Sequence, residues 1–387
     1  MHPATVSLAS DGLVFRAFRT VGAATAEQVR PLRGIVTLIL VTWVPLAVLC
    51  ALDGTLVGGG VEVPFLSDPA VNARLLVALP LLLLGEIKFA SVARMLFDLI
   101  RERHLVPEAE LPALDARVER LVHERDSWLV EGLIIAGSAA LMWFTRDMLV
   151  TERIGTHATW MGAGTTLSRA GWYYASVSLF VANVLGLRWV WWIITWTRFL
   201  TGFLRPRIVV IPGHPDQHGG LAFLTIVQSA FALVLAALAT TVAGRLAFEL
   251  LHDGATLAQV RVPAIVVLVL ALLVMFGPLF LFAGRMARLK RQALMQYDGL
   301  GQQLVSGFER KWLGADRTDE PFLGSPDPST YTDYVSVYAS LRLMKPTPLD
   351  PRRAIGAILL VLAPFVPLLL TVMSLKEVLV RMVKLVM

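Results

Sequence analysis

The chain has 387 residues, of which 56% are hydrophobic and only 17% are charged. Soluble domains carry about 25% charged residues, so this composition excludes an ordinary water-soluble protein. The net charge of +6 does not indicate a nucleic-acid partner, because most of the basic residues flank long apolar segments.

Those apolar segments have the length of membrane spans. A spanning helix needs roughly 20 mainly apolar residues, and six segments qualify: 34–52, 75–93, 128–146, 172–196, 221–243 and 263–284. A seventh, residues 354–374, is apolar but contains Pro364 and Pro367. Proline removes a backbone hydrogen-bond donor, so this segment is either a kinked span or a re-entrant hairpin. The pattern predicts an all-α, polytopic helical membrane bundle of six or seven transmembrane helices.

The predicted organisation follows the chain in six parts. These are an N-terminal cytoplasmic segment (1–33), two spans (34–93), a cytoplasmic amphipathic helix (94–127), spans three to six (128–284), a cytoplasmic helical segment (285–353), and a seventh transmembrane or re-entrant helix with an interfacial tail (354–387). We expect the two cytoplasmic segments to form a small helical subdomain.

The distribution of Lys and Arg predicts the orientation, because cytoplasmic loops carry an excess of both. With the N-terminus inside, the cytoplasmic segments hold 24 of these residues and the opposite side holds 9. We therefore predict a cytoplasmic N-terminus. The tail, with Lys376, Arg381 and Lys384, fits poorly. It favours either a re-entrant seventh segment or an amphipathic helix lying at the far interface.

Residues 94–127 show the pattern of an amphipathic helix. Leu114, Val118 and Leu121 recur at helical spacing, with charged residues between them. We expect this helix to dock on another cytoplasmic element.

Residues 285–353 open with a basic cap and continue as a second helix. Its Leu304, Phe308 and Trp312 follow one another in steps of four residues and form an apolar stripe. We expect this helix to pack on the helix of residues 94–127. The three stripe residues are also the candidate contacts for a cytoplasmic protein partner.

Four charged side chains lie inside the predicted spans: Glu86, Lys88, Glu131 and Arg188. An ionisable group there costs a few kcal/mol or more, so it usually faces a bundle interior, a partner or a water-filled path. At about 1.5 Å per helical residue, all four fall in the cytoplasmic leaflet, and their charges sum to zero. Glu86 and Lys88 are two residues apart and cannot pair well with each other. We expect Glu86 to pair with Arg188, and Lys88 to pair with Glu131 or a carbonyl.

This four-residue charge cluster has two interpretations. It can line or gate a polar path for an ion, a proton or an anionic solute. It can equally be a neutral salt-bridge network that holds the helices in register. The sequence is consistent with both.

A second group of candidate functional residues, which could bind a metal ion, precedes the fifth span. His214, Asp216 and His218 are metal-ligand types in a loop rich in Pro and Gly, but no second cluster completes a metal site. We keep the three as candidate metal ligands. The alternative is a loop that turns the chain at the membrane surface, with Asp216 capping the fifth span. No cofactor is expected.

Three stretches together resemble a known family. They are His214-Pro215-Asp216 with Gly219-Gly220-Leu221, the segment Phe308-Glu309-Arg310-Lys311-Trp312-Leu313, and the segment Glu320-Pro321-Phe322-Leu323-Gly324-Ser325. Over about the last 180 residues the chain resembles an uncharacterised family of polytopic inner-membrane proteins of proteobacteria. The resemblance implies a bacterial inner-membrane location and supplies no catalytic residues. A small residue commonly stands in that family where His218 is here, which weakens the metal interpretation.

The sequence contains no phosphate-binding P-loop and no H-E-x-x-H, G-x-S-x-G or C-x-x-C motif. The first functional hypothesis rests on the charges inside the spans: a channel or transporter for an ion or small solute, in which the four-residue charge cluster lines or gates the path. We expect such a protein to be a homo-oligomer in the lipid bilayer. The alternative is a membrane scaffold or signalling component whose cytoplasmic helices bind a partner protein. A membrane enzyme acting on lipid through the three candidate metal ligands is a third, weaker hypothesis.

Overall fold

The computed structural model describes residues 31–125, 127–148, 157–314 and 320–370. Within these ranges the chain is almost entirely helical, as predicted, and its only paired strands are β1 (Gly162–Ala163) and β2 (Thr166–Leu167), which form a two-residue antiparallel hairpin. The predictions for residues 1–30 and for the tail from residue 371 lie outside the described ranges.

Seven helices are long and apolar enough to cross a membrane. The first comprises α2 (Pro31–Thr42) and α3 (Val44–Leu52). The second comprises α4 (Pro69–Asn72), the π-helical turn η3 (Ala73–Ala78) and α5 (Leu79–Glu102). The third is α7 (Trp128–Met148), which follows the amphipathic α6 (Leu111–Arg125). The fourth runs through α8 (Arg169–Tyr173), the π-helical η6 (Tyr174–Ser178), α9 (Leu179–Arg198), the π-helical η7 (Phe199–Leu204) and α10 (Arg205–Arg207).

The remaining spans lie in the second half of the chain. The fifth is made of α11 (Phe223–Ser229) and α12 (Ala232–Leu251). The sixth is α13 (Leu257–Phe280), and it leads into α14 (Ala283–Trp312). After α15 (Asp327–Leu343), the seventh candidate consists of α16 (Pro351–Leu362), the 3-10 turn η8 (Ala363–Phe365) and α17 (Val366–Leu370). Pro364 and Pro367 lie where this helix changes geometry, as a kink requires.

Helix α12 lies at the centre of the bundle. It packs against α4, η3, α5, α13 and α16. In the most apolar 18-residue stretch of its span, 78% of the residues are buried. Gly244 permits a close approach to α4, because a Cβ at that position would lie 2.8 Å from the carbonyl oxygen of Pro69. Small residues let membrane helices approach closely where lipid supplies no hydrophobic driving force.

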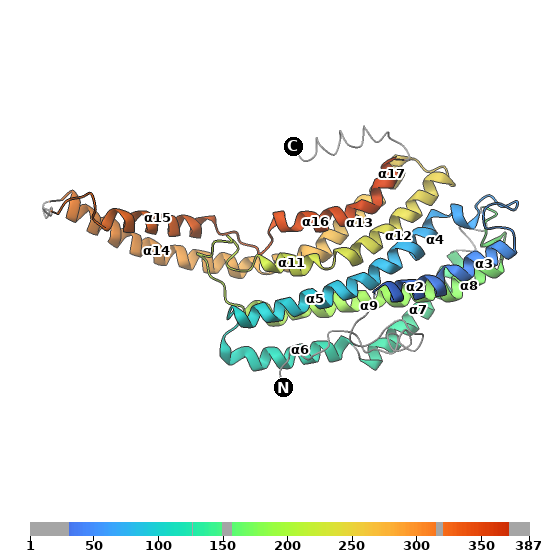
Figure 1. The fold of residues 1–387 in the computed structure, drawn as a ribbon, viewed down its shortest axis with the longest axis horizontal. Coiled ribbons are helices and arrows are strands. Elements are labelled where there is room, and N and C mark those ends of the chain that lie inside the picture. The colour runs from blue at the N-terminus through green and yellow to red at the C-terminus, as the bar shows by residue number, and fades with distance from the viewer. Residues whose placement is uncertain (1–30, 126, 149–156, 315–319, 371–387) are drawn as a thin grey trace.

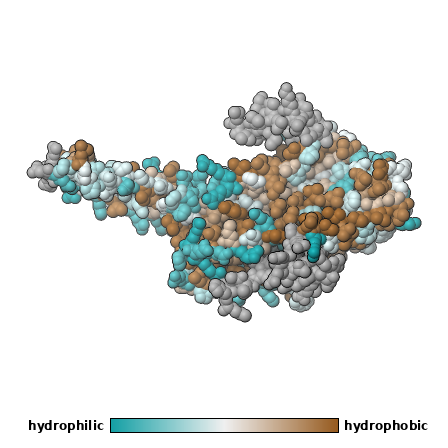
Figure 2. All heavy atoms as spheres, viewed as in Figure 1, coloured by the Kyte–Doolittle hydropathy of each residue, from teal (hydrophilic) through white to brown (hydrophobic). Residues whose placement is uncertain are grey.

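Helices α14 and α15 form a hairpin that projects away from the bundle (Figure 1). The continuous helical segment Leu257–Trp312 has 56 residues and so measures about 84 Å, far more than the hydrocarbon thickness of about 30 Å. Most of α14 therefore extends beyond any bilayer that α13 crosses. Figure 2 shows hydrophobic side chains gathered over the bundle, with hydrophilic ones frequent on the hairpin and at the end of the bundle beside it.

The apolar stripe of α14 packs against α15, so the expected packing on the helix of residues 94–127 is wrong. The ring of Phe308 lies 5.4 Å from that of Tyr331, and Trp312 donates to Asp327 Oδ2 at 3.1 Å. Helix α6 packs against α9 and η7 instead. The physical reason is connectivity: α15 is the next helix after α14 along the chain and covers its apolar side.

Three loops meet at the other end of the bundle, which we call the loop end (residues 53–68, 157–168 and 252–256). The backbone N–H of Trp160 donates to Val63 O at 3.0 Å, and the buried Trp160 indole donates to Asp68 Oδ2 at 3.1 Å. Asp68 also caps α4 through its Oδ1. The indole and the cap thus tie the second loop to the start of the second span.

His157 joins the three loops electrostatically. Its Nδ1 lies 2.7 Å from Glu62 Oε2, and its Nε2 lies 3.1 Å from Asp253 Oδ1. Both contacts are complete hydrogen bonds only when both ring nitrogens carry hydrogens. The hydrogen bond to Glu62 is the main cause of a raised pKa for His157, and the charge of Asp253 contributes.

The interactions of His157 with Glu62 and Asp253 predict that the stability of the folded chain depends on pH. Because the pKa of His157 is raised in the folded chain, its stabilisation is fully present below the usual histidine pKa of about 6.5 and is lost as the pH rises through the folded value. The variant His157→Gln should lower the melting temperature most near pH 5.5 and progressively less toward pH 9. The exposed His123 on α6, which forms no ion pair with a described residue, provides the control, since His123→Gln should leave the pH profile unchanged. A His157→Gln effect of equal size at every pH would contradict this account.

Candidate functional site

The structure confirms the predicted pairing of Glu86 with Arg188. Glu86 lies on α5 and Arg188 on α9, each near the middle of its candidate span. Arg188 Nη2 donates to Glu86 Oε1 at 3.1 Å, and the side chains are 14% (Arg188) and 24% (Glu86) exposed within the chain. Such a pair is stable in an apolar environment only when each charge has its partner.

Aromatic side chains surround this ion pair. Trp189 donates from its Nε1 to Leu82 O at 3.1 Å, and the ring of Phe89 contacts those of Trp189 and Trp192 edge to face. A cavity of about 30 Å³ remains beside Glu86 and Arg188. It holds about one or two water molecules, which is too little for a continuous aqueous path through the described residues.

Arg125 is the residue of this site that sequence reasoning missed. It ends α6, is 8% exposed, and lies 5.5 Å above the ring of Trp192 while lining the same cavity. By its charge alone, Arg125 is expected among the exposed residues between the apolar positions of this helix. Yet Arg125 continues the stripe of Leu114, Val118 and Leu121 in steps of four, three and four residues, and that signal placed it on the buried face.

The second predicted ion pair is absent. Lys88 is exposed and makes no hydrogen bond or ion pair with any residue that the structure describes. Glu131 is buried at 7% exposure in the first turn of α7 and does not line the cavity beside Glu86. The expected pairing of Lys88 with Glu131 or a carbonyl is therefore wrong. Lys88 lies about 200° around the helix from Glu86, a direction that leads out of the bundle.

Asp216 organises the loop that precedes α11. It accepts backbone N–H groups from His218 at 2.8 Å, Gly220 at 3.0 Å and Ala222 at 3.1 Å. Burial acts to raise the pKa of Asp216, but these three hydrogen bonds and the neighbouring His214 outweigh it, and the pKa is lowered. The carboxylate thus serves as a loop and helix cap, which was the alternative to a metal ligand.

His218 is buried and joins this loop to the segment before α16. Its Nδ1 lies 2.6 Å from Asp216 O and its Nε2 lies 3.0 Å from Leu349 O. Thr225 reinforces the joint, donating to Pro348 O at 2.8 Å and accepting from Asp350 N at 2.9 Å. Both nitrogens of His218 are therefore occupied by the chain itself.

No group of three or more His, Cys, Asp or Glu side chains able to hold a metal ion occurs among the described residues. His214 Nδ1 lies 3.0 Å from Asp216 Oδ1 and accepts the backbone N–H of Asp216 at 3.2 Å, so the structure brings two of the three candidate ligands together within the loop. The loop acts chemically as a joint between α11 and α16.

Comparison with protein-family models, with curated proteins and with solved structures found no match to this chain. The resemblance of about its last 180 residues to an inner-membrane family therefore stays a prediction.

The ion pair predicts a strong non-additivity of substitutions. Removing one partner, as in Glu86→Leu or Arg188→Met, leaves a charge at the middle of the bundle, and we expect a loss of about 3 kcal/mol in unfolding free energy. The double variant should recover most of that loss, because it removes both charges. Lys88→Met on the same helix is the control and should change stability by less than about 0.5 kcal/mol. Additive single effects, measured by reversible unfolding in detergent, would contradict the pairing.

Proposed function

We propose that this chain is a membrane-anchored scaffold or signalling component that presents the α14–α15 hairpin to a protein partner. The observation that supports it is a set of exposed apolar side chains on a part of the chain that lies beyond the membrane span. Met295 is 73% exposed, Leu313 is 78% exposed and Leu323 is 88% exposed. The excess of Lys and Arg on this side of the chain supports a cytoplasmic position for the hairpin.

The hairpin buries little of its own surface. In α15 only Leu341 is buried, and in α14 only Met286, Gly301 and Trp312 are buried. Stable helical folds bury an apolar stripe on each helix against other elements, and large exposed apolar patches mark interaction sites. A partner that covers Leu313 and Leu323 would supply the missing layer.

Phe308 and Trp312, from the apolar stripe of α14, position the exposed residues and are not themselves available to a partner. Phe308 and Trp312 contact Phe322 at 6.3 and 5.1 Å between ring centroids, so they hold the turn that carries Leu323. Lys311 adds ion pairs of 2.9 Å to Glu320 and 2.7 Å to Asp327. Polar replacement of Phe308 or Trp312 would disturb the turn, whereas Leu313 and Leu323 are available to a partner.

Site-specific photo-crosslinking tests this proposal. A crosslinker at residue 313 or 323 of the full-length protein in cells should yield one discrete adduct larger than the chain, which mass spectrometry can identify. With the crosslinker at residue 313, the change Leu323→Ser should reduce the adduct at least fivefold without altering the melting temperature, because Leu323 is exposed and adjoins Phe322, whose ring packs on Trp312. Gln302→Ser, an exposed polar site on α14, is the matched control. Absence of any adduct, or one that Leu323→Ser leaves intact, would contradict the proposal.

A second candidate is transport of an ion or small anion, supported by the charges at mid-bundle. Two arginines, Arg125 and Arg188, and one carboxylate, Glu86, line a single cavity. A solute would pass only if the ion pair separated, since the cavity beside it has a volume of only about 30 Å³ and is lined by Phe89, Trp189 and Trp192.

Flux measurements in liposomes distinguish this candidate. If the pair gates a path, the wild-type protein should raise chloride or proton flux above that of empty liposomes. Glu86→Gln should then change the flux several-fold while Lys88→Met does not. Flux equal to that of empty liposomes, together with the stability loss described above, would leave the pair with a structural role only.

A further inference from the structure

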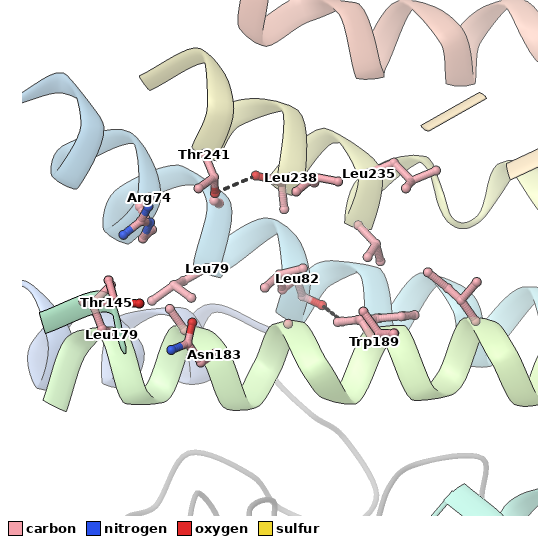
Figure 3. A pocket seen from close by; sticks show the side chains of 17 residues that line it. Arg74, Leu79, Leu82, Thr145, Leu179, Asn183, Trp189, Leu235, Leu238 and Thr241 are labelled. Atoms are coloured by element: carbon pink, nitrogen blue, oxygen red, sulfur yellow. Dashed lines mark hydrogen bonds between the residues drawn. The ribbon is translucent and has the colours of Figure 1, made fainter. Parts of the chain in front are cut away.

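A cavity of about 360 Å³ lies between α5, α9 and α12, beside Arg74. This volume lies in the range of about 300–1,000 Å³ that is typical of ligand pockets. It is separate from the ion-pair cavity, with Trp189 lining both. Figure 3 shows the side chains that line it.

The lining has a polar end and an apolar end. The polar members are Arg74, Thr145, Asn183 and Thr241, which come from four different spans and lie at the side toward the loop end (Figure 3). Deeper in the bundle, Leu82, Trp189, Ile193 and Leu235 form the apolar part. From Leu179 to Ile193 the cavity follows α9 for about 21 Å. That length exceeds the depth of one leaflet, about 15 Å, so the cavity has the polarity and length of an amphiphile.

Arg74 has hydrogen-bonding capacity left at the polar end. Its Nη1 donates to the Tyr174 hydroxyl at 2.7 Å, and it forms no ion pair with any carboxylate in the described ranges. Asn183 makes no side-chain hydrogen bond to a described residue, although it lies within a span. Polar groups inside a membrane are costly without partners, so these donors favour a polar ligand at this end.

The backbone at this position is itself unusual. Arg74 lies in the π-helical turn η3 and Tyr174 in the π-helical turn η6. Such turns are rare and occur frequently at functional sites. Each lies about five residues from the start of its span at the loop end, which places the pair about 8 Å inside the helix start, where an arginine reaches the headgroup region.

The cavity opens toward lipid. Val190 and Leu238 line it and are 53% and 49% exposed, so its mouth lies between α9 and α12 on an apolar surface of the bundle. A molecule that enters there comes from the bilayer. We infer that this cavity is a binding site for an anionic membrane phospholipid, with its phosphate on Arg74 and an acyl chain along Leu82 and Trp189.

Charge complementarity selects this occupant. The guanidinium keeps donors for the bidentate contacts that phosphate oxygens accept, and no described carboxylate neutralises it. A zwitterionic lipid brings its own cation to the same place, so it gains less from Arg74.

Native mass spectrometry of the full chain, released from nanodiscs, tests the inference. With equal amounts of phosphatidylglycerol and phosphatidylcholine of the same acyl chains, the protein should retain phosphatidylglycerol with at least tenfold preference. Arg74→Met should remove that preference, whereas Arg74→Lys should keep part of it. Arg245→Met is the matched control, because it removes a cation on α12 that is already paired with Glu249, and the preference should stay.

A cavity-filling variant tests the apolar part. A Cβ at Gly186 meets no atom within 4 Å, and this residue lines the cavity. Gly186→Leu should therefore reduce retention of both lipids without lowering the melting temperature. Equal retention of the two lipids by the wild-type protein, or the same lipid retention in Arg74→Met, Gly186→Leu and wild type, would overturn the inference. So would occupancy by a free fatty acid or detergent alone.

Discussion

The cost of leaving a polar group without a partner in an apolar environment governs the interior of this protein. Glu86 and Arg188 meet that constraint by pairing across two spans. Gln228 meets it by accepting from Trp196 Nε1 at 3.0 Å and donating to Met275 O at 2.8 Å, which joins three spans through one buried amide. Threonine hydroxyls meet it locally, as Thr240 does by bonding Ala236 O. These few polar contacts therefore set the register of the helices relative to one another.

Beyond the bilayer the constraint relaxes, and the architecture changes accordingly. The α14–α15 hairpin exposes most of its residues and holds itself together with a narrow set of contacts. Gly301 permits the Tyr334 ring to lie against α14, since a Cβ there would fall 3.0 Å from Tyr334 Cζ. A helix pair with so little buried area is well suited to present a surface, which is why the hairpin and the mid-bundle charges support different functions.

Part of the site was predictable from the sequence, for identifiable reasons. The Glu86–Arg188 pair follows from two charges at similar depth, because membrane burial leaves each few alternatives. The predicted partner of Lys88 was wrong for a geometric reason. The spacing of Glu86 and Lys88 gives the angle between them around α5, but it does not say which of the two faces the bundle. Arg125 was missed because its place on an apolar stripe was judged by charge alone. The cavity at Arg74 could not be predicted from the sequence, since its four polar lining residues come from four separate spans.

By itself the sequence determined the helical class, the approximate spans and the presence of costly charges, because hydropathy and length act locally along the chain. Only the tertiary structure decided which charges meet, that the α14 stripe packs on α15, and where a cavity remains. Those outcomes depend on helix rotation and close approach, as at Gly244 against Pro69. Contacts between distant segments set both, and no local pattern encodes them.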